Sequence, residues 1–354
     1  MKIKYVAADL HKATTTIAVK DENGKTIRRS VMETTEENLR SEIEAIPGTV
    51  HLTFEESQYA NWMYDALRPL VDKLVVCEPR HNRLLSSGDK NDELDADQLA
   101  DLLRAGLLKP VYHGEQSKRD LRELVKSYDQ LISDRTRTKN RINALFSGRG
   151  IKAPEGGLYA TDLEARTTLI KKLPGRGMRQ RAMCLYVELN CQDQLVKEAR
   201  KEMLAEGKKF PGVARLRTVP GFGPIRATQA VAWIQTPHRF RTKGQFRKYV
   251  GLAVVSKSSS DWVVTESGFK RETRIQTRGL NQKFHRPLKA IFKGAAKDAA
   301  TRNEAWKNHQ NALIGDGMRP DLARLTIARK LASIVLTVWK QGVDYDESKT
   351  NLRS

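Results

Sequence analysis

The sequence predicts an α/β unit followed by a mainly helical remainder, on the strength of three observations. The chain opens with three β-rich runs, and segments with helical and strand patterns then alternate up to residue 110. A long stretch, Glu115 to Phe146, contains neither proline nor glycine and repeats its apolar residues at helical spacing. The last third carries further amphipathic patterns, of which Leu322 to Trp339 is the clearest.

The three opening runs predict a sheet that begins with a hairpin. Residues 3–9 and 15–20 are apolar or β-branched, and 27–32 follow as a third run. The dipeptide Asn23-Gly24 separates the second run from the third, and Asn-Gly between two such runs is a strong hairpin signal.

Alternating helices and strands are predicted next. Thr34 and Glu37 have the spacing of a capping box and predict the start of a helix that Pro47-Gly48 ends. The remaining segments are a strand at 50–54, a helix at 61–70, a strand at 74–77 and a helix at 92–105. Three consecutive strands followed by such crossovers are the order of the ribonuclease H-like fold.

Acidic residues fall at the ends of these predicted elements. Asp9 ends the first strand, Glu55 and Glu56 end the fourth, and Asp92 and Asp95 share one face at the start of the last helix. Strand ends are where α/β sheets build sites, and two divalent metals need about this many carboxylates to clamp a phosphodiester. We expect these acids to hold Mg²⁺ or Mn²⁺, with either Glu55 or Glu56 as the ligand. For Glu93 and Asp97 we expect a solvated or capping role.

Three blocks carry a family resemblance. The segments VAADLHK (6–12), FEES (54–57) and KNDELDA (90–96) resemble the conserved blocks of the DEDD transposases of bacterial insertion sequences, the insertion-sequence-110 family. The resemblance implies a catalytic domain like that of the Holliday-junction resolvase RuvC. The middle block departs from the family's usual Glu-Ala-Thr-Gly. Arg80, in the EPRHNRLL stretch, is also similar to the family and is expected to contact nucleic acid.

The long helical stretch has a basic second half. Its apolar spacing is typical of a coiled-coil-like helix, and a second helical stretch at 179–207 is expected to pair with it. Such a helix could pack within its own domain, or it could be a dimerisation arm that also touches a phosphate backbone, which the resemblance favours. The basic residues concerned are Arg135, Arg137, Lys139 and Arg141.

Residues 216–234 read LRTVPGFGPIRATQAVAWI, the pattern of a helix-hairpin-helix. Gly221 and Gly223 would let backbone N–H groups approach a phosphate at a helix N-terminus, and Arg226 stands in the first turn of that helix. The alternative is an ordinary tight turn between two helices.

A basic and aromatic stretch follows, and it leads to a serine cluster in GLAVVSKSSSDW (251–262). The resemblance implies a nucleophilic serine here, and spacing from Gly251-Leu252 favours Ser259, with Ser258 next. A serine hydroxyl needs activation, and we expect the carboxylate–metal site to supply it once the two domains come together. The basic residues expected to bind nucleic acid are Arg241, Lys243, Arg247, Lys248 and Lys257.

The net charge of +21 indicates a polyanionic partner. The charge is unevenly placed, because acids exceed bases by four in residues 1–110 and residues 111–354 carry +25. A basic chain with one slightly acidic segment fits a division between a carboxylate site and a nucleic-acid-binding remainder.

Composition also excludes several classes of protein. Apolar and aromatic residues are spread along the chain, so a disordered basic tail is excluded, and the sequence has no run of about 18 apolar residues to span a membrane. The first residues, MKIKYVAADLHK, are too short and charged for a secretory signal. Three cysteines without metal-type spacing fit a reduced cytoplasm. We expect a cytoplasmic, nucleoid-associated bacterial protein with no membrane partner.

We expect four regions: a RuvC-like catalytic domain (1–110), a helical coiled-coil dimerisation region (111–208), a transposase domain with the helix-hairpin-helix and the serine (209–343), and a frayed tail (344–354). The resemblance implies a recombinase that cuts and rejoins donor and target double-stranded DNA through a phosphoserine. It also implies a structured guide RNA encoded by the element and a homo-oligomer, a dimer that becomes a tetramer in the synapse. The alternatives are a junction-resolving nuclease that uses water and a non-catalytic DNA-binding protein.

Overall fold

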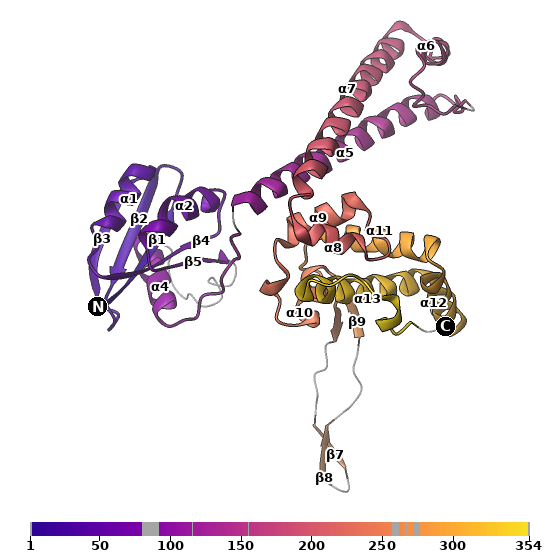
Figure 1. Ribbon diagram of the computed structural model, residues 1–354. Coiled ribbons are helices and arrows are strands. Elements are labelled where there is room, and N and C mark those ends of the chain that lie inside the picture. Colours follow the sequence, from indigo (N-terminus) through magenta and orange to yellow (C-terminus); the bar gives the residue numbers. More distant parts are fainter. Residues whose placement is uncertain are drawn as a thin grey trace. The chain divides into compact units, whose positions relative to one another are not determined.

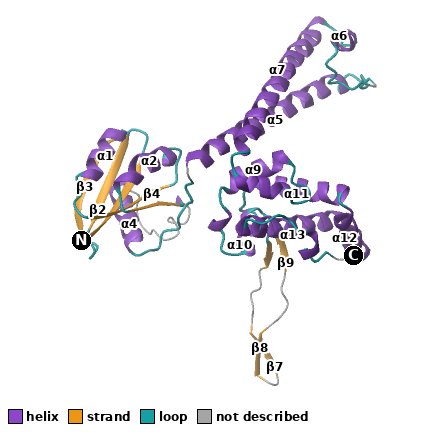
Figure 2. Ribbon diagram, in the orientation of Figure 1, coloured by secondary structure: helices purple, strands orange, loops and turns teal. Residues whose placement is uncertain are grey.

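The computed structural model describes residues 2–79, 92–114, 116–154, 156–256, 262–265, 268–271 and 277–352. It divides the chain into two compact units, Met1–Gly114 and Glu115–Ser354 (Figure 1). The first is an α/β unit and the second is mainly helical (Figure 2). The predicted fold class is therefore confirmed at the level of an α/β domain followed by helices.

The first unit is built on a five-stranded mixed sheet. Its strands are β1 (Ile3–Leu10), β2 (Thr14–Lys20), β3 (Thr26–Glu33), β4 (Thr49–Glu55) and β5 (Lys73–Cys77), in the spatial order β3-β2-β1-β4-β5. The first three strands pair antiparallel, and β4 and β5 extend the sheet parallel to β1. Antiparallel neighbours can be joined by short turns, whereas parallel ones need helical crossovers, so this topology follows from the order of the elements.

Two layers of helix cover the sheet (Figure 1). Helices α1 (Glu36–Glu44) and α2 (Ala60–Leu67) pack on one face over a large apolar core that includes Val6, Leu52 and Phe54. Helix α4 (Asp92–Arg104) packs on the other face, against a small patch made by Ala7, Cys77, Leu99 and Ala100. Small side chains on both surfaces let this helix approach the strands closely.

The start of α1 differs from the prediction by one residue. Thr35, rather than Thr34, is the N-cap, and its hydroxyl accepts a hydrogen bond from the backbone N–H of Asn38. Thr34 instead hydrogen-bonds to the β1–β2 hairpin. Its hydroxyl bonds to the hydroxyl of Thr15 (2.8 Å) and donates to the carbonyl oxygen of His11 (2.9 Å). The capping box of Thr34 and Glu37 was therefore wrong in register.

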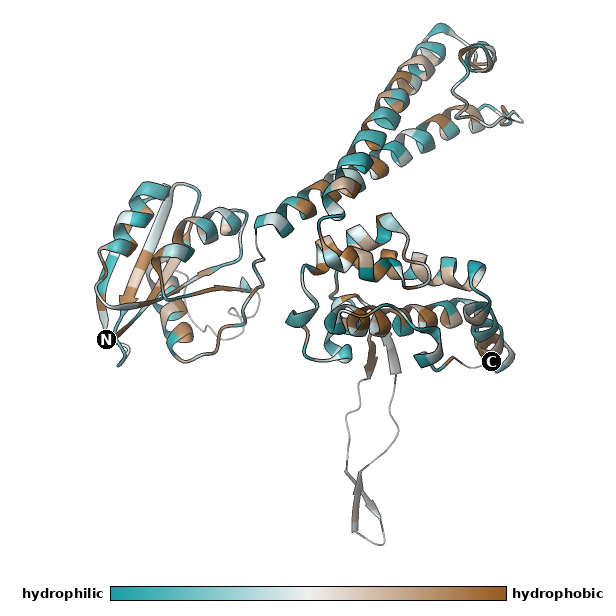
Figure 3. Ribbon diagram, in the orientation of Figure 1, coloured by the Kyte–Doolittle hydropathy of each residue, from teal (hydrophilic) through white to brown (hydrophobic). Residues whose placement is uncertain are grey.

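The second unit begins with a long helical hairpin. Helices α5 (Gln116–Ser147) and α7 (Arg176–Gly207) pack along each other, with α6 (Leu163–Lys171) between them in sequence. Both long helices carry hydrophobic residues among hydrophilic ones (Figure 3), and the predicted pairing of the two is confirmed. The lower parts of α5 and α7 share the core of the helical body, whereas a separate core, with Phe146 and Leu189 among its members, lies at the far end.

A polar layer separates these two cores. Thr138 is fully buried, and its hydroxyl donates to the Glu188 carboxylate at 2.7 Å. One turn lower on α5, Arg135 pairs with Asp193 of α7 at 3.2 Å. These are the two polar steps in the apolar pattern of α5, and they fix how α5 and α7 align.

The helical body consists of α8 (Pro211–Arg217), α9 (Pro224–Ile234), α10 (Lys243–Tyr249), α11 (Arg286–Arg302), α12 (Glu304–Gly315) and α13 (Pro320–Gln341). Short strands interrupt it, with β6 (Val254–Ser256) paired to β9 (Thr277–Leu280) and β7 (Trp262–Thr265) paired to β8 (Gly268–Arg271). The sequence did not predict these strands.

The C-terminal residues are attached to the body and are not frayed. Asp344 pairs with Arg215 at 2.6 Å, and the backbone N–H of Tyr345 donates to Thr218. Tyr345 and Leu352 pack against the main core, and the Tyr345 hydroxyl accepts from the indole N–H of Trp306. The prediction of a frayed tail was therefore wrong for the residues up to 352.

We predict that Gly221→Ala lowers the free energy of unfolding of the helical body by about 3 kcal/mol. Gly221 has φ +82°, and a Cβ there would collide with the backbone carbonyl of Ala295 on α11. Gly223→Ala is the matched control, because no atom lies within 4 Å of a Cβ at that position and its φ is −70°. Urea unfolding followed by circular dichroism measures both variants, and similar losses would contradict the packing argument.

Candidate functional site

Two of the predicted acids end neighbouring parallel strands. Asp9 lies near the end of β1 and Glu55 is the last residue of β4. The strands pair in parallel up to Ala8 and Phe54, so Asp9 and Glu55 follow on adjacent strands at the same level. Adjacent strands are about 4.8 Å apart, which brings the two residues side by side at the carboxyl edge of the sheet.

Both acids belong to the face that α4 covers. Side chains alternate between the faces of a strand, and Ala7, two residues before Asp9, packs with Leu99 and Ala100 of α4. Glu55 is aligned with Cys77, another member of this patch. Asp9 and Glu55 therefore share one face as well as one edge.

Glu56 is held differently. Its backbone N–H donates to the Cys77 carbonyl oxygen at 2.9 Å, and its carboxylate lies 2.8 Å from Nε2 of His113. The His113 side chain is only 4% exposed and stacks on Tyr64, whose ring packs against the core of the opposite face. The Glu56 carboxylate is thus bound to a buried histidine.

Helix α4 runs along the sheet toward the edge at which Asp9 and Glu55 lie. Near its C-terminal end, Asp101 pairs with Lys20, which lies opposite Tyr5, and the Arg104 guanidinium lies against Gly24 in the β2–β3 turn. From Asp101 back to Asp92 the helix rises about 13 Å. From Tyr5 to Asp9 the strand rises about 13 Å as well. The N-terminus of α4 therefore reaches the level of the two strand-end acids.

The acids of α4 have distinct environments. Asp92 is the first helical residue, and its side chain lies outside the described part of the structure. Asp95 is exposed, whereas Asp97 is 7% exposed. Asp97 accepts hydrogen bonds from Arg29 and from the Thr26 hydroxyl (3.0 Å), and Lys20 lies 3.8 Å away. The solvated or capping role expected for Asp97 was therefore wrong, because its carboxylate is buried and bound to basic side chains.

The donor set suits a hard divalent cation. Carboxylate oxygens are the ligands that Mg²⁺ and Mn²⁺ prefer, and Asp9 and Glu55 present them at one edge. The Asp9 carboxylate is 3.1 Å from Nε2 of His11. Among the residues whose side chains are described, no three His, Cys, Asp or Glu residues form a group able to hold a metal ion.

The four basic residues of α5 all have partners within the chain. Arg135 pairs with Asp193 at 3.2 Å, Arg137 with Asp134 at 2.8 Å and Arg141 with Glu188 at 3.3 Å. The Lys139 ammonium lies 5.1 Å from the centre of the Tyr159 ring. A phosphate would have to compete with these partners, most of all at Arg135, whose side chain is 28% exposed.

The Pro-Gly-Phe-Gly segment connects α8 to α9. Phe222 is buried, and Gly221 packs against the backbone of Ala295. Arg226 donates to the Gly221 carbonyl oxygen at 2.8 Å and lies 3.3 Å from Asp298 of α11. Gly223 is the N-cap of α9 and has open space around it. Packing thus accounts for Gly221 and Arg226, while the N-terminus of α9 at Gly223 is the part open to a ligand.

The aromatic residues of the basic stretch belong mostly to the core. Phe240 is 6% exposed and Phe246 is fully buried, while Tyr249 stacks on His285. Burial, together with the positive charges of Arg239 and Arg122, lowers the pKa of His285 to about 4. The basic side chains divide in the same way, with Arg241, Lys243 and Lys248 exposed and Arg247 half-buried, its Nε donating to the Lys243 carbonyl oxygen.

Some predicted residues lie outside the described part of the structure. They are Arg80, Lys257, Ser258 and Ser259. The serines fall between β6 and β7 in the chain.

Sequence reasoning also missed residues at the site. His113 lies 57 positions from Glu56, and no local pattern connected the two. Lys20 and Asp97 are 77 positions apart, and only the predicted packing of the last helix on the sheet could have suggested their pairing.

Comparison with known proteins gives consistent matches. A family model described as a transposase, of the DEDD insertion-sequence-110 type, matches residues 6–149, and a model of the IS116/IS110/IS902 transposase family matches 213–309. The chain is 24% identical to the transposase for insertion sequence element IS1111A of Coxiella burnetii, over 62% of this chain and 61% of that protein. It is 25% identical to a protein of Sinorhizobium fredii named as transposase y4pF/y4sB, over 73% of this chain and 65% of that protein. The chain thus aligns with about three fifths of the length of these relatives. In its described part, no helix is long and apolar enough to cross a bilayer.

We predict that Asp97→Asn destabilises the α/β unit by about 2–3 kcal/mol, because it leaves the buried Lys20 ammonium with one partner fewer. Asp95→Asn, the exposed control on the same helix, is expected to change stability by less than about 0.5 kcal/mol. Adding Lys20→Met to Asp97→Asn should restore part of the loss. Chemical unfolding measures the free energy of unfolding of all three variants. Equal losses for Asp97→Asn and Asp95→Asn would show that the buried Asp97 carboxylate does not stabilise the α/β unit.

Proposed function

The chain belongs to the insertion-sequence-110 family of transposases, and on that premise we propose that it cuts and rejoins DNA at the carboxyl edge of its sheet. The observation that carries the proposal is that Asp9 and Glu55 stand side by side, near the ends of two adjacent parallel strands. The packing of α4 against the same face of the sheet supports the addition of Asp92 and Asp95 to this site. The strand order β3-β2-β1-β4-β5 supports a ribonuclease H-like, RuvC-like fold for this unit.

We propose Asp9, Glu55, Asp92 and Asp95 as the carboxylates of the site. A divalent cation held by them, Mg²⁺ or Mn²⁺, would neutralise and polarise the phosphodiester. Between the two glutamates, Glu55 is favoured because it shares a face with Asp9, whereas Glu56 bonds to His113. Glu56 and His113 then orient the strand end that carries Glu55.

The strand-breaking step is proposed to use a serine, Ser259 or Ser258. Its oxygen would bond to phosphorus as the bond to the leaving DNA oxygen breaks, and that oxygen would take up a proton equivalent to the one that serine loses. A free DNA hydroxyl would reverse the step on a second strand and rejoin the DNA. The resemblance described above supports this chemistry and also supports guidance by an element-encoded structured RNA within a homo-oligomer.

Nucleic acid is proposed to lie against the basic second unit. Residues 111–354 carry +25, and exposed basic side chains such as Arg241, Lys243 and Lys248 are available to phosphates. Gly223, at the N-terminus of α9, supplies a helix-terminal phosphate site of the helix-hairpin-helix kind.

We predict that wild-type protein cleaves DNA in the presence of Mg²⁺ or Mn²⁺, and that Asp9→Asn and Glu55→Gln each lower the rate at least about 100-fold, because each removes a proposed metal ligand. Glu56→Gln is the matched control, since glutamine can still bond to His113, and it should retain most activity. The measurement is the rate of nicking of labelled DNA that carries the element ends. Loss in Glu56→Gln with activity kept in Glu55→Gln would reverse the assignment, and full activity in both would exclude these glutamates.

The serine step has its own readout. We expect wild type to form a covalent protein–DNA adduct that survives denaturing electrophoresis. Either Ser259→Ala or Ser258→Ala should abolish it while leaving DNA binding intact. Cleavage without any adduct would instead indicate water as the nucleophile, and the absence of metal-dependent cleavage would indicate a DNA-binding protein without this activity.

A further inference from the structure

The tip of the α5–α7 hairpin, residues 139–181, has a hydrophobic core separate from that of the helical body. Its core includes Ile142, Phe146, Leu158, Leu169 and Leu173, none of which belongs to the core of the helical body. The polar layer of Thr138 and Glu188 lies just below it. The tip is thus a small, independently packed end on two long helices.

Positive charge is concentrated in this tip. Residues 139–181 contain ten Lys and Arg against three Asp and Glu. The hairpin base, residues 115–138 and 182–208, contains ten of each. A solvent-exposed helical hairpin needs charged residues for solubility, but these can be of both signs. The excess of positive charge at the tip therefore indicates a polyanionic ligand.

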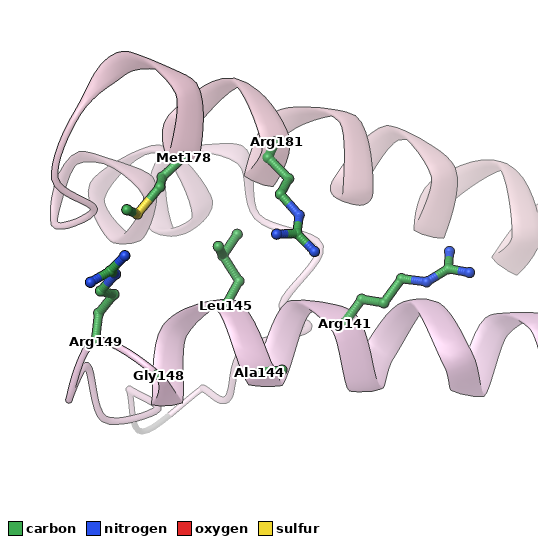
Figure 4. Close-up of a pocket in the computed structure, with 7 residues that line it drawn as sticks. All are labelled: Arg141, Ala144, Leu145, Gly148, Arg149, Met178 and Arg181. Atoms are coloured by element: carbon green, nitrogen blue, oxygen red, sulfur yellow. The ribbon is translucent and has the colours of Figure 1, made fainter.

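A recess between α5 and α7 lies within the tip (Figure 4). Its volume is about 440 Å³, large enough for one nucleotide. Arg141, Arg149 and Arg181 line it, and Figure 4 shows Leu145 and Met178 between Arg149 and Arg181. Ala144, which is exposed, completes the apolar part of the lining.

The three arginines are not equivalent. Arg141 is held by Glu188 at 3.3 Å, and that carboxylate also accepts the Thr138 hydroxyl. Arg149 and Arg181 are exposed, and within the described residues neither forms an ion pair. Two guanidinium groups that have no acidic partner in the described part of the chain therefore flank an apolar surface, each with donors in a fixed fork that suits phosphate oxygens.

We propose that this recess, the tip pocket, binds one unpaired nucleotide of a nucleic acid. Arg149 and Arg181 donate to its phosphate oxygens, and its base lies on Leu145 and Met178. A duplex presents its phosphates outside stacked bases and would leave the apolar surface uncovered, whereas an unpaired base has a free flat face. The proposal rests on the proposed function only in that the chain works on nucleic acid, and it does not involve the carboxylate site.

The test compares two double variants of the full-length protein. Arg149→Gln/Arg181→Gln removes the proposed phosphate donors. Arg200→Gln/Lys201→Gln is the matched control, because it removes two exposed positive charges from α7 within the hairpin base. Fluorescence anisotropy with labelled oligo-U and oligo-dT, at several salt concentrations, measures the affinity of each.

We expect the tip variant to weaken binding of the single strands about tenfold or more. The slope of log affinity against log salt concentration should become shallower by about 0.7, because the contact with one phosphate is lost. The control should change both much less. A further variant, Ala144→Glu, places a carboxylate in the tip pocket and keeps all three arginines. It should weaken single-strand binding to a similar degree. A preference for oligo-U or oligo-dT assigns the ligand to RNA or DNA.

Other outcomes would overturn the proposal. Equal losses in the tip variant and the control would show a general charge effect. Unchanged single-strand binding together with a lost affinity for a poly-glutamate peptide would show that the tip pocket takes an acidic protein segment. A larger loss for duplex DNA than for single strands would contradict the unpaired base. Metal-dependent cleavage by the wild-type protein is assayed in parallel. If cleavage is observed while the tip variant binds single strands normally, the tip-pocket proposal fails and the proposed function does not.

Discussion

The arrangement of the first unit depends on how α4 is held against the sheet. One face of that sheet has a large apolar core, whereas on the α4 face the described residues form a small apolar patch around Ala7 and Cys77. Hydrophobic contact over so small an area leaves a helix free to slide by a turn. The buried Asp97 carboxylate prevents this, because Lys20 and Arg29 reach it from two strands. The position of the first turn of α4, and with it the proposed carboxylate site, follows from this polar anchor.

The second unit shows how a motif can have two physical explanations. The glycines of Pro-Gly-Phe-Gly suggested close approach to a phosphate, yet Gly221 is required by its contact with Ala295 of α11. Arg226 bonds to the same turn and to Asp298. Only Gly223 is left without a packing explanation. A sequence motif of this kind therefore specifies the packing of two helices first and offers a phosphate site second.

The sequence predicted most elements of the fold because each had a local signal. Asn23-Gly24 marked the hairpin, and the apolar spacing marked α5 and α7, which run for 32 residues each. The strand-end positions of Asp9 and Glu55 followed from the strands themselves. Strands β6 to β9 were missed because they have only three or four residues and no alternating pattern long enough to detect. The partners of Glu56 and Asp97 were missed because pairing across the sheet depends on tertiary contacts and not on spacing.

The polar layer in the α5–α7 hairpin fixes the distance between the helical body and the tip of the hairpin. The Thr138–Glu188 and Arg135–Asp193 pairs match in one register, so α5 cannot slip along α7 by a turn without breaking this hydrogen bond and this ion pair. At its lower end α5 is joined to α9 by the bond between Asp129 and Gln229. From Asp129 to Ser147, the last residue of α5, the helix extends about 27 Å, since it rises 1.5 Å per residue. A nucleic acid that touched both the body and the tip would have to span about eight base pairs at 3.4 Å each. The length of a helix could in this way set the length of the nucleic-acid segment that the protein recognises.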